Sequence, residues 1–342
     1  MKPLLVLMLV AAWNAGAASD TTRAASLRLV NPYPSTGPLE ISGSAPANKA
    51  LRAMQAHAAP PLTDLVSRAL QQSLAYALDT PVAVVRRAKR GGAEALEHVA
   101  LVPDGRTLLL AGSDVIIVRN LLTGYDWRRD IKPVALIARM PNVLVGMPHG
   151  SDVRRVVESG IARSKRTLAS SGELASSHLA GALFIRATGA NIGHVAFNGA
   201  HSALRAVVAG EVTAAFVPLP AFLDYVRNAR LRPQAIADDV RHPSLPDLIT
   251  LSEAGLPSVS GAGWYGLFAP YAMPAQLINR TASIMAAEQD DARFSASMAQ
   301  AGLRVERAKG PAFSNLIETD YGRWQAYLQA RPEFAIPPAP EN

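Results

Sequence analysis

Strand-like and helix-like segments alternate along most of this chain, and that alternation is the feature that most restricts its fold. Short β-branched or apolar runs predict strands at residues 27–30, 81–85, 107–111, 134–138, 142–145, 167–170, 194–197 and 213–217. Helical spacing of apolar residues predicts helices at 62–78, 151–164, 176–188, 202–209, 221–227, 276–288, 292–301 and 312–330. Strands and helices in this order favour parallel sheets built from right-handed βαβ units.

The length of 342 residues exceeds that of one ordinary domain and predicts two lobes. We place the first lobe at 27–125 plus 255–330 and the second at 126–254. Residues 38–60, rich in Ser, Gly, Ala and Pro, are interpreted as an insertion in the first lobe. The Pro-rich residues 331–342 are interpreted as a flexible tail. With 49% hydrophobic and 18% charged residues, the composition is that of a well-packed folded protein.

The N-terminus has the pattern of a secretory signal peptide at residues 1–18. Lys2 provides the positive charge, residues 3–13 the apolar run, and Ala15 to Ala17 the small residues that a signal peptidase reads. No later run reaches the roughly 18 apolar residues of a membrane span, so stable membrane insertion is not expected. The sequence therefore predicts an exported protein.

Composition also excludes several kinds of site. The chain has no cysteine, so disulfides, thiolate zinc sites and iron–sulfur clusters are impossible. The seven histidines show no metal-ligand spacing, and no metal is expected. The net charge of +7 includes basic clusters at 86–90 and 163–166 without interleaved aromatic residues. We interpret it as a solvated basic surface or a field that steers an anion, and expect no nucleic-acid binding.

Motifs of catalysis are missing as well. The sequence has no Gly-x-Ser-x-Gly elbow, no phosphate-binding Gly-Lys-Ser/Thr loop and no dinucleotide fingerprint, so neither an enzyme nor a cofactor is expected. Ser171 and His178 lie close in sequence, which keeps an exported serine hydrolase as an alternative.

Three loops follow predicted strands and precede helices, at the sheet edge where α/β proteins bind ligands. They are residues 31–37, 170–178 and 197–200, and they contain Gly, Ser and Asn. The N-terminus of a helix offers N–H groups and partial positive charge, which suit a carboxylate. The hydroxyls of Ser171, Ser176 and Ser177 would add donors. Ordinary turn formation is the alternative explanation for each loop taken alone.

Several segments, in order, resemble one family. They are 27–34 (LRLVNPYP), 103–110 (PDGRTLLL), 141–145 (PNVLV), 169–172 (ASSG) with 177–181 (SHLAG), 194–199 (HVAFNG), and 251–257 (LSEAGLP) with 264–270 (WYGLFAP). Together they are similar to the periplasmic substrate-binding proteins of tripartite tricarboxylate transporters, also called the Bug family. The resemblance covers nearly all of the chain after the signal peptide.

This resemblance implies an α/β, two-lobed periplasmic-binding-protein fold of type II-like topology, each lobe a mostly parallel sheet flanked by helices. It implies a periplasmic receptor that captures a small organic carboxylate between the lobes and delivers it to membrane permease subunits. We expect a monomer, because the sequence shows no extended apolar face. A sensor or scaffold of the same fold, acting on a signalling partner, is the alternative. The loops and the resemblance together give these ligand-binding candidates: Tyr33, Ser35, Thr36, Thr63, Asp64, Ser171, Gly172, Ser176, Ser177, His178, Phe197, Asn198, Gly199, Ala200 and Pro218.

The chain departs from the family pattern at three places. The insertion at 38–60 replaces a glycine-rich run, and Arg86 to Arg90 replace an Asn-Arg-Pro-Gly-Ala sequence. Leu174 and Ala175 replace a usual Gly and Thr within the second loop. The fold prediction is unaffected, but the identity of the ligand stays open.

Overall fold

The computed structural model describes residues 27–32, 60–87, 92–102, 105–146, 166–225 and 231–330. The predicted signal peptide, the insertion up to residue 59, the predicted helix 151–164 and the C-terminal tail lie outside these ranges. So do the site candidates Tyr33, Ser35 and Thr36. Within the described ranges, no helix is both long and apolar enough to cross a bilayer.

The first lobe is built on a six-stranded mixed sheet with the order β11-β4-β10-β3-β1-β2. Its strands are β1 (Leu27–Asn31), β2 (Val82–Arg86), β3 (Thr107–Gly112), β4 (Ile131–Met140), β10 (Gly263–Pro270) and β11 (Arg304–Val305). Strands β1 to β4 run in one direction, and β10 and β11 run in the other. The parallel strands are those that the βαβ pattern predicts.

The second lobe is built on a five-stranded sheet with the order β7-β6-β8-β5-β9. Its strands are β5 (Asn142–Gly146), β6 (Arg166–Ser170), β7 (Ile192–Ala196), β8 (Ala214–Pro218) and β9 (Arg232–Ala237). Only β5 runs against the other four.

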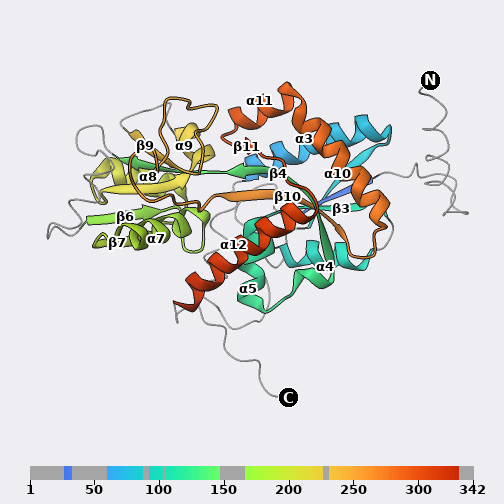
Figure 1. Ribbon diagram of the computed structural model, residues 1–342, viewed down its shortest axis with the longest axis horizontal. Helices are drawn as coiled ribbons and strands as arrows, with labels where there is room; N and C mark the ends of the chain where they lie inside the picture. Colours follow the sequence, from blue (N-terminus) through green and yellow to red (C-terminus); the bar gives the residue numbers. More distant parts are fainter. Residues whose placement is uncertain are drawn as a thin grey trace, which may run out of the picture.

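Helices cover both sheets, and Figure 1 shows the two lobes side by side with β4 and β10 running between them. Around the first sheet lie α3 (Pro60–Leu78), α4 (Ala93–Leu101), the π-helix η2 (Asp114–Val118), α5 (Arg119–Thr123), η3 (Trp127–Arg129), α10 (Ala275–Asp290), α11 (Ala292–Gln300) and α12 (Pro311–Gln329). Around the second lie α7 (Ser176–Thr188), α8 (Ala200–Ala209) and α9 (Leu219–Tyr225). The two-lobed α/β fold predicted from the sequence is therefore confirmed.

Strand pairing moves the boundary between the lobes. β4 pairs with β10 and β11, so residues 131–140 belong to the first sheet, although the sequence placed them in the second lobe. Leu251, Ala254 and Val259 pack in the core of the second sheet, so the chain returns to the first lobe after them and not at residue 255. Pairing between distant strands leaves no local sequence signal, which explains both errors.

Most other elements match their predictions, with a few differences. Helices α4, α5, η2 and η3 and strands β9, β10 and β11 were not predicted. Helix α3 begins at Pro60, two residues before its predicted start, so Thr63 and Asp64 lie inside its first turns. Gly189 and Gly210 end α7 and α8 in the left-handed conformation, directly after the predicted ends of these helices.

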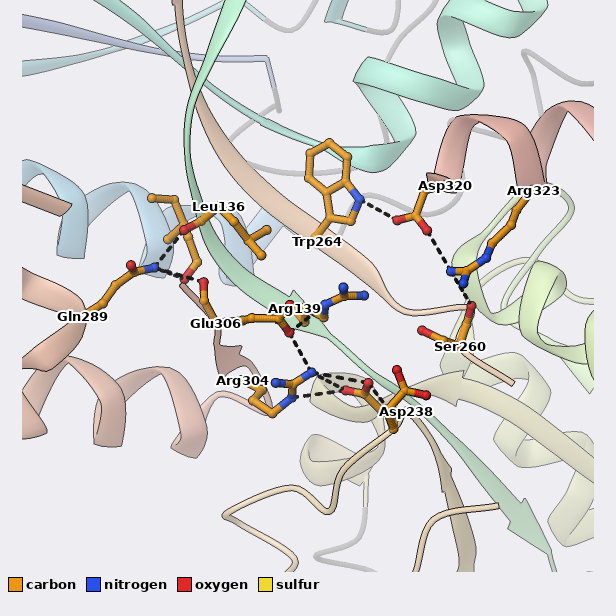
Figure 2. Close-up of polar contacts among 12 residues, drawn as sticks. Leu136, Arg139, Asp238, Ser260, Trp264, Gln289, Arg304, Glu306, Asp320 and Arg323 are labelled. Carbon is orange, nitrogen blue, oxygen red and sulfur yellow. Dashed lines mark hydrogen bonds and ion pairs between the residues drawn. The ribbon is translucent and has the colours of Figure 1, made fainter. Parts of the chain in front are cut away.

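Polar contacts join the lobes where the chain crosses between them. Arg304 on β11 pairs with Asp238, which directly follows β9 in the other lobe, with Nη2 3.1 Å from Oδ2. The same Nη2 lies 2.8 Å from Oε2 of Glu306, and Arg139 on β4 lies 2.8 Å from the same oxygen. Figure 2 shows this chain of four charges beside β4. The two lobes are therefore linked by an ion-pair network in addition to the polypeptide itself.

Candidate functional site

Two of the three predicted loops lie next to each other at the carboxyl edge of the second sheet. β6 ends at Ser170 and β7 at Ala196, and these residues are register partners. The N–H of Phe197 donates to the carbonyl of Ser170 (3.1 Å), and the N–H of Gly199 donates to the carbonyl of Ser171 (2.9 Å). The structure therefore brings the loop at 171–177, hereafter the serine loop, into contact with the loop at 197–199.

Two of the hydroxyls predicted to bind a ligand also form hydrogen bonds within the serine loop. The Oγ atoms of Ser171 and Ser177 are 2.6 Å apart, and the N–H of Ser171 donates to Ser177 Oγ at 3.1 Å. Both residues are buried. One of the two O–H groups is therefore used within the loop, and the other hydroxyl keeps its proton for a further acceptor.

The helix that follows the serine loop begins without a side-chain cap. Ala175 is the N-cap of α7, with an extended ψ of 157°, and no side chain bonds to the first turn. Ser176 and Ser177 occupy the first two helical positions, whose N–H groups have no acceptor within a helix. Because the N-cap residue is an alanine, no cap side chain competes with an anion for these N–H groups.

Asn142, at the start of β5, contacts the first residue of α7. It is the first residue of β5, fully buried, and its Nδ2 donates to the carbonyl of Gly261 at 3.0 Å. Its Oδ1 lies 3.4 Å from Ser176 Oγ. Asn142 was not among the predicted site residues, although an amide at the start of an otherwise apolar strand is a recognisable signal.

His178 is fully engaged within the protein. Its Nδ1 accepts the N–H of Leu174 at 3.1 Å, and its Nε2 lies 2.6 Å from Oη of Tyr327 on α12. Both ring nitrogens are thus occupied, while Ser171 Oγ bonds to Ser177. The structure therefore contains no Ser171–His178 pair of the kind a serine hydrolase needs. Tyr327 was missed because 149 residues separate it from His178.

At the carboxyl edge of the first sheet, the candidates Thr63 and Asp64 make contacts within the protein. Thr63 is 1% exposed, and its carbonyl accepts from Ser67 Oγ, which in turn accepts from Nδ2 of Asn31. Asp64 forms an ion pair with Arg86, with 2.6 Å between Oδ1 and Nη1.

The basic cluster noted in the sequence is partly neutralised by such pairs. Besides the pair of Arg86 with Asp64, Arg87 pairs with Glu94 at 3.0 Å. This part of the basic surface is therefore weaker as an anion-steering field than its sequence indicates.

The remaining candidates lie at the same edge of the second sheet. Pro218 ends β8 opposite Asn142, Asn198 is exposed, and Phe197 is half-buried. Gly199 is the N-cap of α8 with φ 95°, a conformation that favours glycine, and Ala200 begins that helix. The described residues contain no group of three or more His, Asp or Glu able to hold a metal ion.

Comparisons with known proteins agree on one family. The profile described as "Tripartite tricarboxylate transporter family receptor" matches residues 66–332. A UPF0065 protein from the tcbD–tcbE intergenic region of a Pseudomonas species is 28% identical over 273 residues, covering 78% of this chain and 81% of that protein. Protein BugT of Bordetella pertussis is 30% identical over 221 residues, covering 61% of this chain and 66% of its own.

Solved structures show the same fold. A TctC solute-binding protein from Polaromonas superposes with a TM-score of 0.73 at 19% identity, covering 91% of this chain and all of its own. MatC of Rhodopseudomonas palustris, solved with bound malate, gives 0.62 at 23% identity, covering 88% of this chain and 98% of that one. The chain therefore belongs to the receptor family of the tripartite tricarboxylate transporters, whose members are solute-binding proteins.

Proposed function

We propose that this receptor binds a small organic carboxylate at the N-terminus of α7. The observation that carries the proposal is the uncapped first turn of that helix, at the carboxyl edge of the second sheet. Two main-chain N–H groups and the positive end of the helix dipole lie together there, and both favour a carboxylate oxygen. The neighbouring loop, whose backbone bonds to Ser170 and Ser171, carries an amide at Asn198 and an apolar ring at Phe197.

Related structures support the chemical class of the ligand. One structural neighbour was solved with malate and another, also from R. palustris, with adipate. Both ligands are dicarboxylates with short aliphatic chains. We propose the same class here, with the first carboxylate at α7 and the rest of the ligand extending toward the first lobe.

We further propose that the protein works in the periplasm and passes its ligand to permease subunits. The family description and the signal-peptide pattern of residues 1–18 support this role. A sensor of the same fold would bind the ligand in the same way, and only an interaction with a permease distinguishes the two.

The first test is a thermal-shift screen of the protein from Ser19 onward against malate, adipate, citrate, phthalate and glutamate. A ligand present at a hundredfold over its dissociation constant stabilises the folded state by about 2.7 kcal/mol. Stabilisation by at least one acid is the expected result. A flat response to the whole panel contradicts the proposal.

A matched pair of variants then locates the carboxylate. Ser176→Pro removes one main-chain N–H, and proline is tolerated at the first position of a helix. The extended backbone of Ala175 suits a residue that precedes proline. Ser176→Ala removes only the hydroxyl. We expect Ser176→Pro to weaken binding about 10- to 100-fold in calorimetry, as for a lost charge-assisted hydrogen bond, and Ser176→Ala to change it much less. Equal affinity of the two variants would place the carboxylate elsewhere.

A further inference from the structure

The serine loop of the second lobe contains a residue whose side chain belongs to the first. Leu174 is 2% exposed and lies in the same hydrophobic cluster as the residues of the first sheet, together with Leu179 from α7. Its backbone has φ 63°, a left-handed conformation that is sterically unfavourable for leucine. Burial against the first lobe offsets that local strain, so the shape of the serine loop depends on contact between the lobes.

His178 fixes the same loop by hydrogen bonds. Because its Nδ1 accepts the N–H of Leu174, a neutral ring carries its proton on Nε2 and donates it to Tyr327. The ring also stacks on His194, with 4.2 Å between centroids and 15° between planes. Leu174, His178 and Tyr327 thus form a continuous path from the backbone of the serine loop to α12.

Helix α12 is firmly part of the first lobe. Phe313, Ile317 and Trp324 are buried in the first-lobe core. Asp320 accepts the indole N–H of Trp264 on β10 at 3.0 Å, as Figure 2 shows. The ring of Tyr327 also packs against the ring of Trp324 on the same helix, with 5.9 Å between centroids. Tyr327 therefore reaches the second lobe from a fixed position on the first.

We propose that Leu174 and Tyr327 are positioning residues, which hold the serine loop in its binding shape only while the two lobes are in contact. Their role for the ligand rests on the function proposed above. When the lobes separate, Leu174 leaves the first-lobe core and His178 loses its acceptor. The left-handed conformation of Leu174 is then no longer stabilised by burial of its side chain. As a result, the N–H groups at the start of α7 no longer point at one ligand oxygen. Ligand release is thereby coupled to opening through the loop as well as through the distance between the lobes.

The test uses hydrogen exchange and needs no ligand. Amide exchange is followed by mass spectrometry in the unliganded protein from Ser19 onward and in its Tyr327→Phe variant. Peptides covering 171–179 should exchange about tenfold faster in the variant, because the hydrogen bond between Tyr327 and His178 is lost. Peptides from β8 should be unchanged. Tyr321→Phe is the matched control, because Tyr321 lies on the same helix and packs against Arg128 instead of α7.

Leu174→Gly is a second variant. It separates the backbone strain at residue 174 from the contact that the leucine side chain makes with the first lobe. Glycine adopts φ 63° without strain, so a purely local role for Leu174 predicts slower or unchanged exchange of the loop. A positioning role predicts faster exchange confined to 171–179, because the contact with the first lobe is gone. The ¹⁵N signals of His178 give an independent readout: the wild-type ring should show a single Nε2–H tautomer, and Tyr327→Phe should show a mixture.

Each outcome decides the proposal. Faster exchange limited to the loop in both variants supports it. Unchanged exchange in both overturns it, and so does faster exchange spread over the whole second lobe, since that indicates general destabilisation. A wild-type protein that responds to no acid refutes the proposed ligand class, whereas the exchange result still decides whether the first lobe positions the loop.

Discussion

The ion pair between Asp238 and Arg304 gives the sharpest test of how the lobes are held together. The Asp238 side chain is 2% exposed and that of Arg304 is 18% exposed, so both charges are largely removed from water. Arg304→Met would leave the Asp238 carboxylate buried without its cation. Breaking a buried pair in this way costs about 3–5 kcal/mol.

The geometry indicates the lower end of that range. The nitrogens of Arg304 lie 3.1–3.3 Å from the Asp238 oxygens, longer than the roughly 2.7–2.9 Å of strong charge-assisted bonds. In the variant, Asp238 Oδ1 would still accept the hydrogen bond from the N–H of Asp239, at 2.8 Å. We therefore expect Arg304→Met to lower the free energy of unfolding by about 3 kcal/mol.

Asp238→Asn should cost less, about 1–2 kcal/mol. Asparagine keeps the shape of the side chain, and Arg304 keeps Glu306 at 2.8 Å. The double variant should be more stable than the sum of the two single effects predicts, because the neutral amide that replaces the carboxylate needs no cation.

Urea unfolding followed by circular dichroism measures these changes through the midpoint and slope. Arg241→Met is the control, because Arg241 pairs with Glu253 at the surface of one lobe and both side chains are over 40% exposed. Its midpoint should be unchanged. An Arg304→Met midpoint equal to that of the control, or a larger loss in Asp238→Asn than in Arg304→Met, would refute the reasoning.

Three further outcomes can be measured on the same protein. Ser177→Ala removes the acceptor of the buried Ser171 N–H and should cost about 1–3 kcal/mol in urea unfolding, whereas Ser202→Ala, at an exposed contact on α8, should cost almost nothing. Gly302→Ala should cost about 2–4 kcal/mol, because φ is +76° and the new Cβ would lie 2.7 Å from the nitrogen of Pro220. Gly210→Ala, with φ +74° and no atom within 4 Å of the Cβ, isolates the conformational part of that cost. Burial lowers the pKa of His242, so the unfolded chain takes up a proton that the folded chain resists, and stability should fall as the pH drops through the ordinary range of histidine. His242→Gln should flatten the melting temperature between about pH 5 and 8, and an unchanged slope in that variant would contradict the assignment.

The sequence alone determined the identity and order of most strands and helices. Apolar periodicity and turn residues act over a few neighbouring positions, so they can be recognised without the fold. The handedness of βαβ units then placed the loops at 170–178 and 197–200 at one edge of a sheet, and the structure shows them in contact there. β10 escaped prediction because it contains two glycines and no β-branched residue, whereas the equally buried β3 and β5 were recognised.

Tertiary structure alone decided how the site is supported. The antiparallel pairing of β4 with β10 moved the lobe boundary to Pro141, and no local pattern encodes such a pairing. The bond between Ser171 and Ser177 joins two predicted ligand donors to each other, a contact that their spacing in the sequence did not indicate. Tyr327 meets His178 across 149 residues, and Leu174 fills the core of the lobe to which it does not belong. Such contacts depend on the packing of whole elements in three dimensions, whereas the signals in a sequence report mainly the conformation of each short segment.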